Sequence, residues 1–342
     1  MNFDNEKIFV SIASYRDPDI QNTIDSLLDN ADCPDDINIC ILDQWGDHPS
    51  EVRPQPKKNI EVIRIPYQSA KGCGWARSVI QGKVEDEKYY LQIDAHSRFK
   101  PGWDTFNVLT TESLVRDDVT KPILSTTPPV YSKVEDKPWH SSPTNVLCTG
   151  KFDDDGNSCR AGAIPRTNYI DEPLNTPWLI GCYIFSHTTF VHEVPWDPNH
   201  FFFGDEDAMS IRAFTHGFDI FAPHSCLIAH DFDRSDRDIT KGGPGLIWDN
   251  HVEEADFVKT SEQIWHNRDK KSKARLDTLV RNKDADMSIN LGKYGLGDKR
   301  SLEEFEKFAM IDYRNKKILC EDYEEHYQFL ERKHHEQRES LH

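Results

Sequence analysis

The sequence predicts an α/β fold with a mixed, mostly parallel central sheet flanked by helices and followed by a helical C-terminal extension. Two observations lead to this prediction. Within residues 1–100, apolar segments and helical segments follow each other in the order β-α-β-β-α-β. The apolar segments are short and almost uniformly apolar, as is typical of strands whose two faces are both covered. Residues 1–100 are therefore predicted to form a parallel unit of the nucleotide-binding kind.

Four apolar segments are expected to be the strands of this unit. Each is followed by polar or turn-forming residues. They lie at residues 7–13, 37–42, 60–65 and 89–93. The unit has neither a GxGxxG segment nor a Walker P-loop, which argues against a dinucleotide or ATPase site. Such a sheet can instead hold a nucleotide between the loops that follow its first strands.

Two helices are expected to connect these strands. Asp17-Pro18 is typical of a helix start, because proline is tolerated in the first helical turn, and apolar residues at helical spacing follow it up to Leu28. The glycine-flanked segment 71–77, KGCGWAR, is expected to open the second helix, which reaches about Val84.

The rest of the chain continues the alternation less regularly. A helix is expected from Trp103 to about Arg116, and further strands at 122–126, 178–186, 218–221 and 227–229. Residues 131–176 lack a clear period, as is typical of a binding loop or lid, with a hairpin expected around Asp155-Gly156-Asn157. Residues 241–342 are charged and are expected to form exposed helices on the flank of the domain.

Composition limits the partners of the protein. The 342 residues carry a formal net charge of −18, which argues against nucleic acid or an anionic membrane surface as the main partner. An anionic ligand would need a bound cation or a local arginine cluster. The eight cysteines form no CxxC pair, so reduced thiols are expected. No signal peptide and no apolar run near the roughly 20 residues of a membrane span are found, which favours a cytoplasmic protein without a membrane span.

Asp94 and His96 directly follow the strand segment 89–93. Residues two apart in an extended chain point to the same side, so this carboxylate and imidazole can converge just beyond the carboxyl end of the strand. Open α/β sheets bind ligands at that edge. The two groups suit a divalent metal, Mn²⁺ better than Ca²⁺. The alternative is that Asp94 caps a turn and His96 lies on the surface.

A second chemical landmark is the segment 200–207, HFFFGDED. An apolar strand is expected to end at Gly204, where an acidic helix begins. Successive helical positions are about 100° apart, so the three carboxylates cannot all face one way. We expect Asp205 to cap the helix, Glu206 to face the pocket in a catalytic role, and Asp207 to be solvated. The alternative is a purely structural role at the positive end of the helix dipole.

His230 follows the expected strand 227–229 in the way that Asp94 follows its own strand. It is therefore a candidate third metal ligand. The alternative is a surface or capping histidine, which is the more common use of a single histidine.

Together these segments resemble one known family. The chain is similar to GT-A-type glycosyltransferases, and specifically to glycosyltransferase family 60, the hydroxyproline-polypeptide α-N-acetylglucosaminyltransferase group. The matching segments are IFVSIASYRDPDI, GCGWARS, QIDAHSRFKPGWD, FFFGDEDAMSIRAFTHGFDIFAP and residues 230–234. In GCGWARS, Gly74 stands where a bulkier residue is expected.

The resemblance implies a GT-A catalytic domain at 1–240, with a nucleotide-binding part at 1–100 and an acceptor and sugar part at 101–240, before a helical extension at 241–342. It implies a UDP-sugar donor, Mn²⁺ (or Mg²⁺) as cofactor, and retention of the anomeric configuration. The sugar would be N-acetylglucosamine, and the acceptor a hydroxyl group on a protein or glycan.

The resemblance also assigns roles to residues. Asp94-Ala95-His96 corresponds to the DxD-type metal motif, and His230 completes the metal site. Asp205 and Glu206 stand near the transferred sugar or the acceptor. The implied nucleotide-binding residues are Ser11, Tyr15, Arg16, Asp43, Arg77 and Asp94.

The chemistry of sugar transfer fits these residue types. The leaving group is a diphosphate, so negative charge develops on it and must be stabilised. A metal ion on the candidate ligands would act as a Lewis acid and would offset the negative charge of the protein. Arg77 and Arg234 can add phosphate contacts. Retention is compatible with a covalent intermediate on a carboxylate and with attack on the same face as the departing diphosphate.

Two other classes of function are compatible with the sequence. A metal-dependent phosphohydrolase would use Asp94, His96, His230 and Asp231, although such sites normally hold more ligands. A non-catalytic module that binds a nucleotide sugar would hold a partner through residues 131–176.

Overall fold

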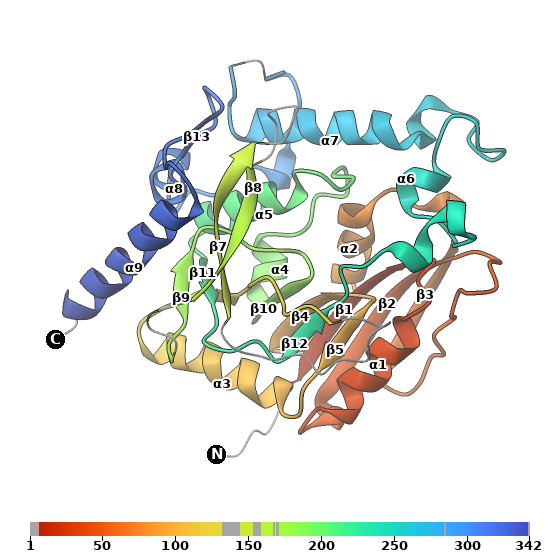
Figure 1. The fold of residues 1–342 in the computed structure, drawn as a ribbon, viewed down its shortest axis with the longest axis horizontal. Coiled ribbons are helices and arrows are strands. Elements are labelled where there is room, and N and C mark those ends of the chain that lie inside the picture. The colour runs from red at the N-terminus through yellow and green to blue at the C-terminus, as the bar shows by residue number, and fades with distance from the viewer. Residues whose placement is uncertain are drawn as a thin grey trace.

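The centre of the protein is an eight-stranded sheet in the order β3-β2-β1-β4-β10-β6-β11-β9 (Figure 1). The computed structural model describes residues 7–131, 144–152, 159–166, 168, 171–283 and 285–340. In sheet order the strands are β3 (Ile60–Pro66), β2 (Ile37–Trp45), β1 (Ile8–Tyr15), β4 (Tyr89–Asp94), β10 (Tyr183–His187), β6 (Pro122–Leu124), β11 (Asp219–Ala222) and β9 (Leu174–Thr176). The first four are parallel to one another, and β10 runs antiparallel to both of its neighbours. The predicted mixed α/β fold is confirmed.

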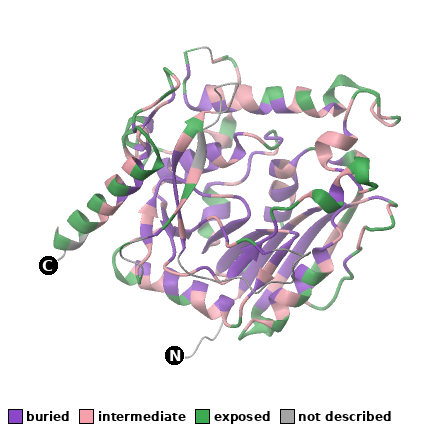
Figure 2. Cartoon of the chain, in the orientation of Figure 1, coloured by how far each residue is buried: buried purple, intermediate pink, exposed green. Residues whose placement is uncertain are grey.

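Helices cover both faces of this sheet, and the alternation along β1 shows why. Val10 packs in an apolar cluster with α1 (Ile20–Asp29) and α3 (Trp103–Arg116), whereas its neighbour Phe9 packs in a second cluster. That second cluster holds side chains of α2 (Cys73–Gln81), α4 (Thr189–Glu193) and α5 (Asp205–Thr215). The inner strands β1, β2 and β4 are therefore buried along most of their length, whereas the edge strand β3 is partly exposed (Figure 2). This explains the uniformly apolar strand segments of the sequence.

Residues 200–203 do not form the expected strand. Their backbone instead anchors the start of α2, because the carbonyl oxygen of Phe201 accepts a hydrogen bond from the Cys73 N–H at 2.8 Å. Gly72 has a φ of 116°, and a Cβ there would lie 2.4 Å from the same carbonyl oxygen. A Cβ on Gly74 would lie 2.7 Å from another carbonyl oxygen of this segment, so the bulkier residue expected at that position does not fit.

The segment 131–176 is less irregular than expected. It contains β9 at the edge of the central sheet and an antiparallel pair, β7 (Asn145–Phe152) and β8 (Cys159–Pro165). The expected turn at Asp155-Gly156-Asn157 lies outside the described residues. A further pair, β5 (Ser97–Phe99) and β12 (Ile228–His230), lies beside the carboxyl end of β4 and becomes important for the site.

The C-terminal extension packs on the flank of the domain, as expected, but its helices are only partly exposed because they share a core with the domain. Trp178, Ile211 and Phe214 pack in one apolar cluster with Leu276 and Phe305 of the extension. The elements of this part are α6 (Ile247–Asn250), α7 (Trp265–Leu279), α8 (Leu302–Ala309), β13 (Ile311–Asp312), β14 (Lys317–Ile318) and α9 (Tyr323–Ser340). None of the helices in the described part of the chain is long and apolar enough to cross a membrane.

The buried ring of His326 fixes α9 against this core. Its Nδ1 accepts a hydrogen bond from the Thr149 N–H at 2.7 Å, and its Nε2 donates to the carbonyl oxygen of Phe308 at 3.0 Å. These two bonds require the neutral ring. Burial lowers the pKa of His326 from 6.5 to about 4.

We expect His326 to make folding sensitive to acid. The folded state favours the neutral ring, so its contribution is complete above pH 6.5 and is lost as the pH falls toward 4. The full loss is about 3 kcal/mol, from the pKa difference and 1.36 kcal/mol per unit. Urea unfolding of the wild type and His326→Gln between pH 7 and pH 4 measures it, with His335→Gln, at an exposed position, as control. Parallel pH profiles of the wild type and His326→Gln would contradict the assignment.

Candidate active site

A cavity of about 410 Å³ opens at the carboxyl ends of β1 and β4. Its walls come from segments far apart in the sequence: the ends of these strands, the start of α2, the start of α5 and residues 246–248 at α6. Phe202, Phe203 and Trp248 supply aromatic surface to the cavity. The predicted residues that line this cavity are Tyr15, Arg77, Asp94, His96, Asp205, Glu206, His230 and Arg234.

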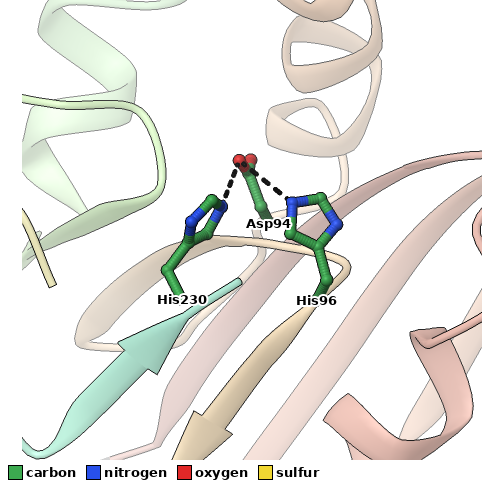
Figure 3. Close-up of side chains that lie close together, drawn as sticks. All are labelled: Asp94, His96 and His230. Carbon is green, nitrogen blue, oxygen red and sulfur yellow. Dashed lines mark hydrogen bonds and ion pairs between the residues drawn. The ribbon is translucent and has the colours of Figure 1, made fainter. Parts of the chain in front are cut away.

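The three predicted metal ligands lie together in this cavity (Figure 3). One ligand atom from each of Asp94, His96 and His230 lies within 4.8 Å of the others. His230 Nε2 is 3.1 Å from Asp94 Oδ2, and His96 Nε2 is 3.9 Å from the same oxygen. The histidine side chains are 2% and 7% exposed, whereas the Asp94 side chain is 25% exposed. A carboxylate and two imidazoles at these separations are a donor set that fits a divalent transition metal.

Strand pairing explains how His230 reaches a pair of residues more than 130 positions earlier in the chain. Asp94 is the last residue of β4, and the chain turns at His96 into β5. Strand β12 pairs antiparallel with β5, and His230 stands opposite Ser97 in that register. This register places the third candidate ligand, His230, beside His96.

The charge around Asp94 favours its ionised form. Burial opposes ionisation, but the hydrogen bond to His230 and the nearby Arg77 outweigh it and hold the pKa of Asp94 well below its usual range. Asp94 is therefore a carboxylate, the form that a metal ion requires.

Arg77 bridges two carboxylates of the cavity. Its guanidinium donates to Asp94 Oδ1 and to Asp205 Oδ2, each at 3.3 Å. Gly181 makes room for it, because a Cβ there would lie 2.5 Å from the guanidinium nitrogens. Gly181, within the predicted strand segment 178–186, thus allows the close approach of the Arg77 side chain.

The three carboxylates at the start of α5 all line the cavity, which corrects the expected division of roles. Gly204, with a φ of 79°, is the N-cap residue, and no side chain caps the helix. Asp205 pairs with Arg77 instead and accepts a hydrogen bond from the Cys73 thiol at 3.1 Å. Asp207 is buried and not solvated. The glycine takes the cap position because it alone adopts this left-handed conformation readily.

The surroundings of Glu206 favour the protonated form of its carboxyl group. Its Oε1 accepts a hydrogen bond from the Gly181 N–H at 2.6 Å. Burial, followed by repulsion from Asp205, raises the pKa of Glu206 from 4.5 to about 8. Burial also raises the pKa of Asp205. Strongly perturbed carboxylates in a cavity are typical of functional sites.

Of four further residues predicted to bind the nucleotide, only Tyr15 lines the cavity. Tyr15 lines the cavity, whereas Arg16 is buried in an ion pair with Glu51 at 2.7 Å. Asp43 is buried 3.6 Å from the Arg64 guanidinium, and burial raises its pKa to about 6. Ser11 lies within β1, fully buried and away from the cavity. Neither Arg16 nor Asp43 lines the cavity, and the geometry does not favour Ser11 as a ligand contact.

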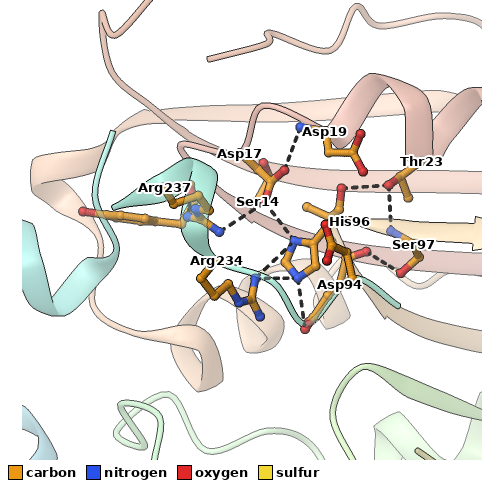
Figure 4. Close-up of polar contacts among 12 residues, drawn as sticks. Ser14, Asp17, Asp19, Thr23, Asp94, His96, Ser97, Arg234 and Arg237 are labelled. Atoms are coloured by element: carbon orange, nitrogen blue, oxygen red, sulfur yellow. Dashed lines mark hydrogen bonds and ion pairs between the residues drawn. The ribbon is translucent and has the colours of Figure 1, made fainter. Parts of the chain in front are cut away.

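Sequence reasoning missed two residues beside the metal ligands. Asp17 was interpreted only as part of a helix start, and Arg237 was not singled out. In the structure Asp17 contacts His96 and Arg237 (Figure 4). The position of Asp17, two residues after the end of β1, was the feature of the sequence that could have indicated a role at the site. Asp231 is buried, and none of its atoms lines the cavity.

The sequence model of one protein family, described as Glycosyltransferase (GlcNAc), matches residues 7–55 and 47–315. The chain belongs to this glycosyltransferase family. The match covers every residue of the cavity described above. A search of curated proteins finds no match.

Solved structures agree with this assignment at the level of the fold. The glycosyltransferase chain resembles the crystal structure of GalNAc-T7 with UDP, GalNAc and Mn²⁺, with a TM-score of 0.54 and 15% identity. The match covers 88% of this chain and 54% of that one, so the chain spans about half the length of its neighbour. The mannosyltransferase PcManGT from Pyrobaculum calidifontis with GDP-Man and Mn²⁺ matches at a TM-score of 0.41 and 11% identity, over 67% of this chain and 58% of that one. The fold that the chain shares with GalNAc-T7 is the GT-A fold.

For this glycosyltransferase we expect His230→Ala to weaken Mn²⁺ binding about 10- to 100-fold or more, comparable to the loss of supporting contacts at other metal sites. The ring is buried and offers one of the three candidate ligand atoms. Titration of Mn²⁺ into the variant, followed by electron paramagnetic resonance of the free ion, measures the change. His187→Ala, a histidine of β10 outside the cavity, is the control. Unchanged Mn²⁺ affinity in His230→Ala would return this residue to a structural role.

Proposed function

We propose that this glycosyltransferase transfers N-acetylglucosamine from a UDP-sugar to a hydroxyl group of a protein or glycan, with retention of the anomeric configuration. The divalent ion, Mn²⁺ or Mg²⁺, would be held by Asp94, His96 and His230. The observation that carries the proposal is this group of ligands in one cavity beside Arg77. The proposed finer assignment is to glycosyltransferase family 60.

Two similarities support the choice of donor. The family description includes GlcNAc, and GalNAc-T7 binds UDP, GalNAc and Mn²⁺ on the same fold. The cavity has the matching parts: metal ligands at the end of β4, Tyr15 at the end of β1 and the acidic start of α5. A sugar nucleotide that bridges these parts would place its diphosphate near the metal ligands and its sugar near α5.

The residues around the ligands have separate tasks in this proposal. A bound divalent ion would supply Lewis-acid stabilisation of the departing diphosphate. Arg77 holds Asp94 and Asp205 in place and keeps positive charge at the base of the cavity. Arg234 lies at the cavity wall, 2.6 Å from His96 Nε2, and is the second cation within reach of a phosphate. Glu206 lines the cavity from the start of α5, where the sugar or the acceptor would stand.

The geometry does not favour the phosphohydrolase. Two-metal sites need a second set of ligands. Within the described ranges, only Asp94, His96 and His230 form a group suited to a metal ion. A measurement of donor turnover distinguishes a transferase from a non-catalytic module that only binds the nucleotide sugar.

A panel of UDP-sugars tests the proposal. The protein is incubated with each donor and Mn²⁺, and release of UDP by background hydrolysis is measured. We expect the highest release with UDP-N-acetylglucosamine, and none in Asp94→Asn. Tight binding of a donor without release of UDP would favour the binding module. Release of inorganic phosphate from simple phosphate esters would favour the phosphohydrolase.

A further inference from the structure

The ring of the candidate metal ligand His96 contacts the carboxylate of Asp17, which comes from another segment of the chain. Its Nδ1 lies 2.9 Å from Asp17 Oδ2 (Figure 4). Asp17 follows the end of β1 and is 3% exposed, so this contact is shielded from water. A carboxylate accepts hydrogen bonds and donates none, so Nδ1 must carry the proton.

A second contact fixes the same tautomer. The Arg234 guanidinium, which only donates, lies 2.6 Å from His96 Nε2. Nε2 therefore accepts the bond from Arg234, and it lies 3.9 Å from Asp94 Oδ2. Metal ligation through Nε2 needs this same tautomer, and a metal ion at this nitrogen would replace the contact with Arg234.

The two oxygens of Asp17 serve different purposes. Oδ1 accepts a hydrogen bond from the backbone N–H of Asp19 at 2.8 Å and shapes the turn before α1. Oδ2 accepts from His96 and, at 3.2 Å, from Arg237 Nη1. A turn needs only the first oxygen. The second is held between a metal ligand and a buried arginine, which a purely local role does not explain.

Arg237 fixes Asp17 in turn. It is buried in a short helical turn, Ser235–Arg237, and also donates to the carbonyl oxygen of Tyr15. The guanidinium therefore joins the end of β1 to the carboxylate behind His96. Residues that orient a metal ligand in this way commonly change metal affinity when they are replaced.

We propose that Asp17 is a positioning residue that sets the tautomer and orientation of His96 for metal binding, and that Arg237 holds Asp17 for this task. The inference rests on the proposed metal site and adds two residues to it. Neither residue belongs to the group of three candidate ligands.

Asp17→Asn tests the inference, because it keeps the shape of the side chain but can donate to Nδ1 and reverse the tautomer. We expect Mn²⁺ affinity, measured by electron paramagnetic resonance of the free ion without nucleotide, to fall about 10- to 100-fold. Asp17→Glu, which restores the carboxylate, is expected to recover part of the affinity. Arg237→Met is expected to weaken Mn²⁺ binding in the same direction and by less.

Asp19→Asn is the matched control. Asp19 is another buried carboxylate of the same turn, paired with Arg98 at 2.9 Å and with the Tyr131 hydroxyl at 2.7 Å, and it contacts none of the metal ligands. The Asp19→Asn variant is expected to lose thermal stability but to keep wild-type Mn²⁺ affinity.

Equal Mn²⁺ affinity in the wild type and Asp17→Asn, or an equal loss in Asp17→Asn and Asp19→Asn, would overturn the role of Asp17. If Asp17→Asn fails to fold, wild-type affinity in Arg237→Met would overturn the proposal. A wild type that binds no Mn²⁺ would overturn the proposed metal site as well.

Discussion

Asp94→Ala is expected to abolish sugar transfer, and EDTA is expected to do the same to the wild type until Mn²⁺ is restored. Asp94 supplies the only carboxylate of the three candidate ligands. Its loss would leave two imidazoles and no carboxylate beside the positive charge of Arg77, a set that binds a divalent cation weakly. Release of UDP from the preferred UDP-sugar, with and without chelator, is the measurement.

The variant is expected to stay folded. Asp94 ends β4, and its side chain is 25% exposed at the cavity rather than packed in the core. Arg77 keeps Asp205 as an ionic partner. Thermal unfolding and circular dichroism check this, with Asp86→Asn, an exposed aspartate in the connection before β4, as control. Full activity in a chelated sample, or in Asp94→Ala, would remove the metal from the mechanism.

The candidate ligands could be predicted because each directly follows or ends a strand that is recognisable from its own short segment of sequence. Asp94 and His96 follow a uniformly apolar strand, and the two-residue period of a strand places them on one side. His230 was found by the same rule, because it ends a strand. The structure then explains their meeting through the register of β12 on β5, which no local pattern in the sequence specifies.

The errors have a common physical origin. Residues 200–203 are apolar enough for a strand, but their carbonyl groups bind the start of α2, a partner more than 120 residues earlier in the chain. Asp205 has the composition of a helix cap, but Arg77 engages its carboxylate and Gly204 takes the cap position. Asp17 looks like a turn residue because one of its oxygens is used in a turn. Each side chain has a local use and a distant one, and only the local use is visible in the sequence.

Glu206→Gln is expected to lower transfer by about 100-fold or more, while UDP and Mn²⁺ binding stay nearly unchanged. The substitution keeps the shape and the bond from the Gly181 N–H, and removes the ability to move a proton or stabilise a cation. A 100-fold loss corresponds to about 2.7 kcal/mol of transition-state stabilisation. Glu193→Gln, at an exposed glutamate of α4, is the control for the loss of a charge.

The same substitution is expected to stabilise the fold at high pH. The pKa of Glu206 is raised from 4.5 to about 8, so the folded state favours the neutral acid. The wild type therefore loses stability as the pH rises from 4.5 through about 8, and glutamine, which is neutral throughout, does not. The difference in melting temperature between Glu206→Gln and the wild type should grow over this pH range. A variant that is both less active and more stable would indicate a carboxylate kept in place for function.

Asp205→Asn completes the comparison, because it removes the anionic partner of Arg77 without touching Glu206. We expect it to weaken donor binding more than the rate of transfer, since Arg77 also holds Asp94. Steady-state kinetics that separate kcat from KM, together with UDP affinity, distinguish the two variants. A Glu206→Gln protein with wild-type turnover, beside a folded but inactive Asp205→Asn, would show that Asp205 rather than Glu206 acts on the sugar.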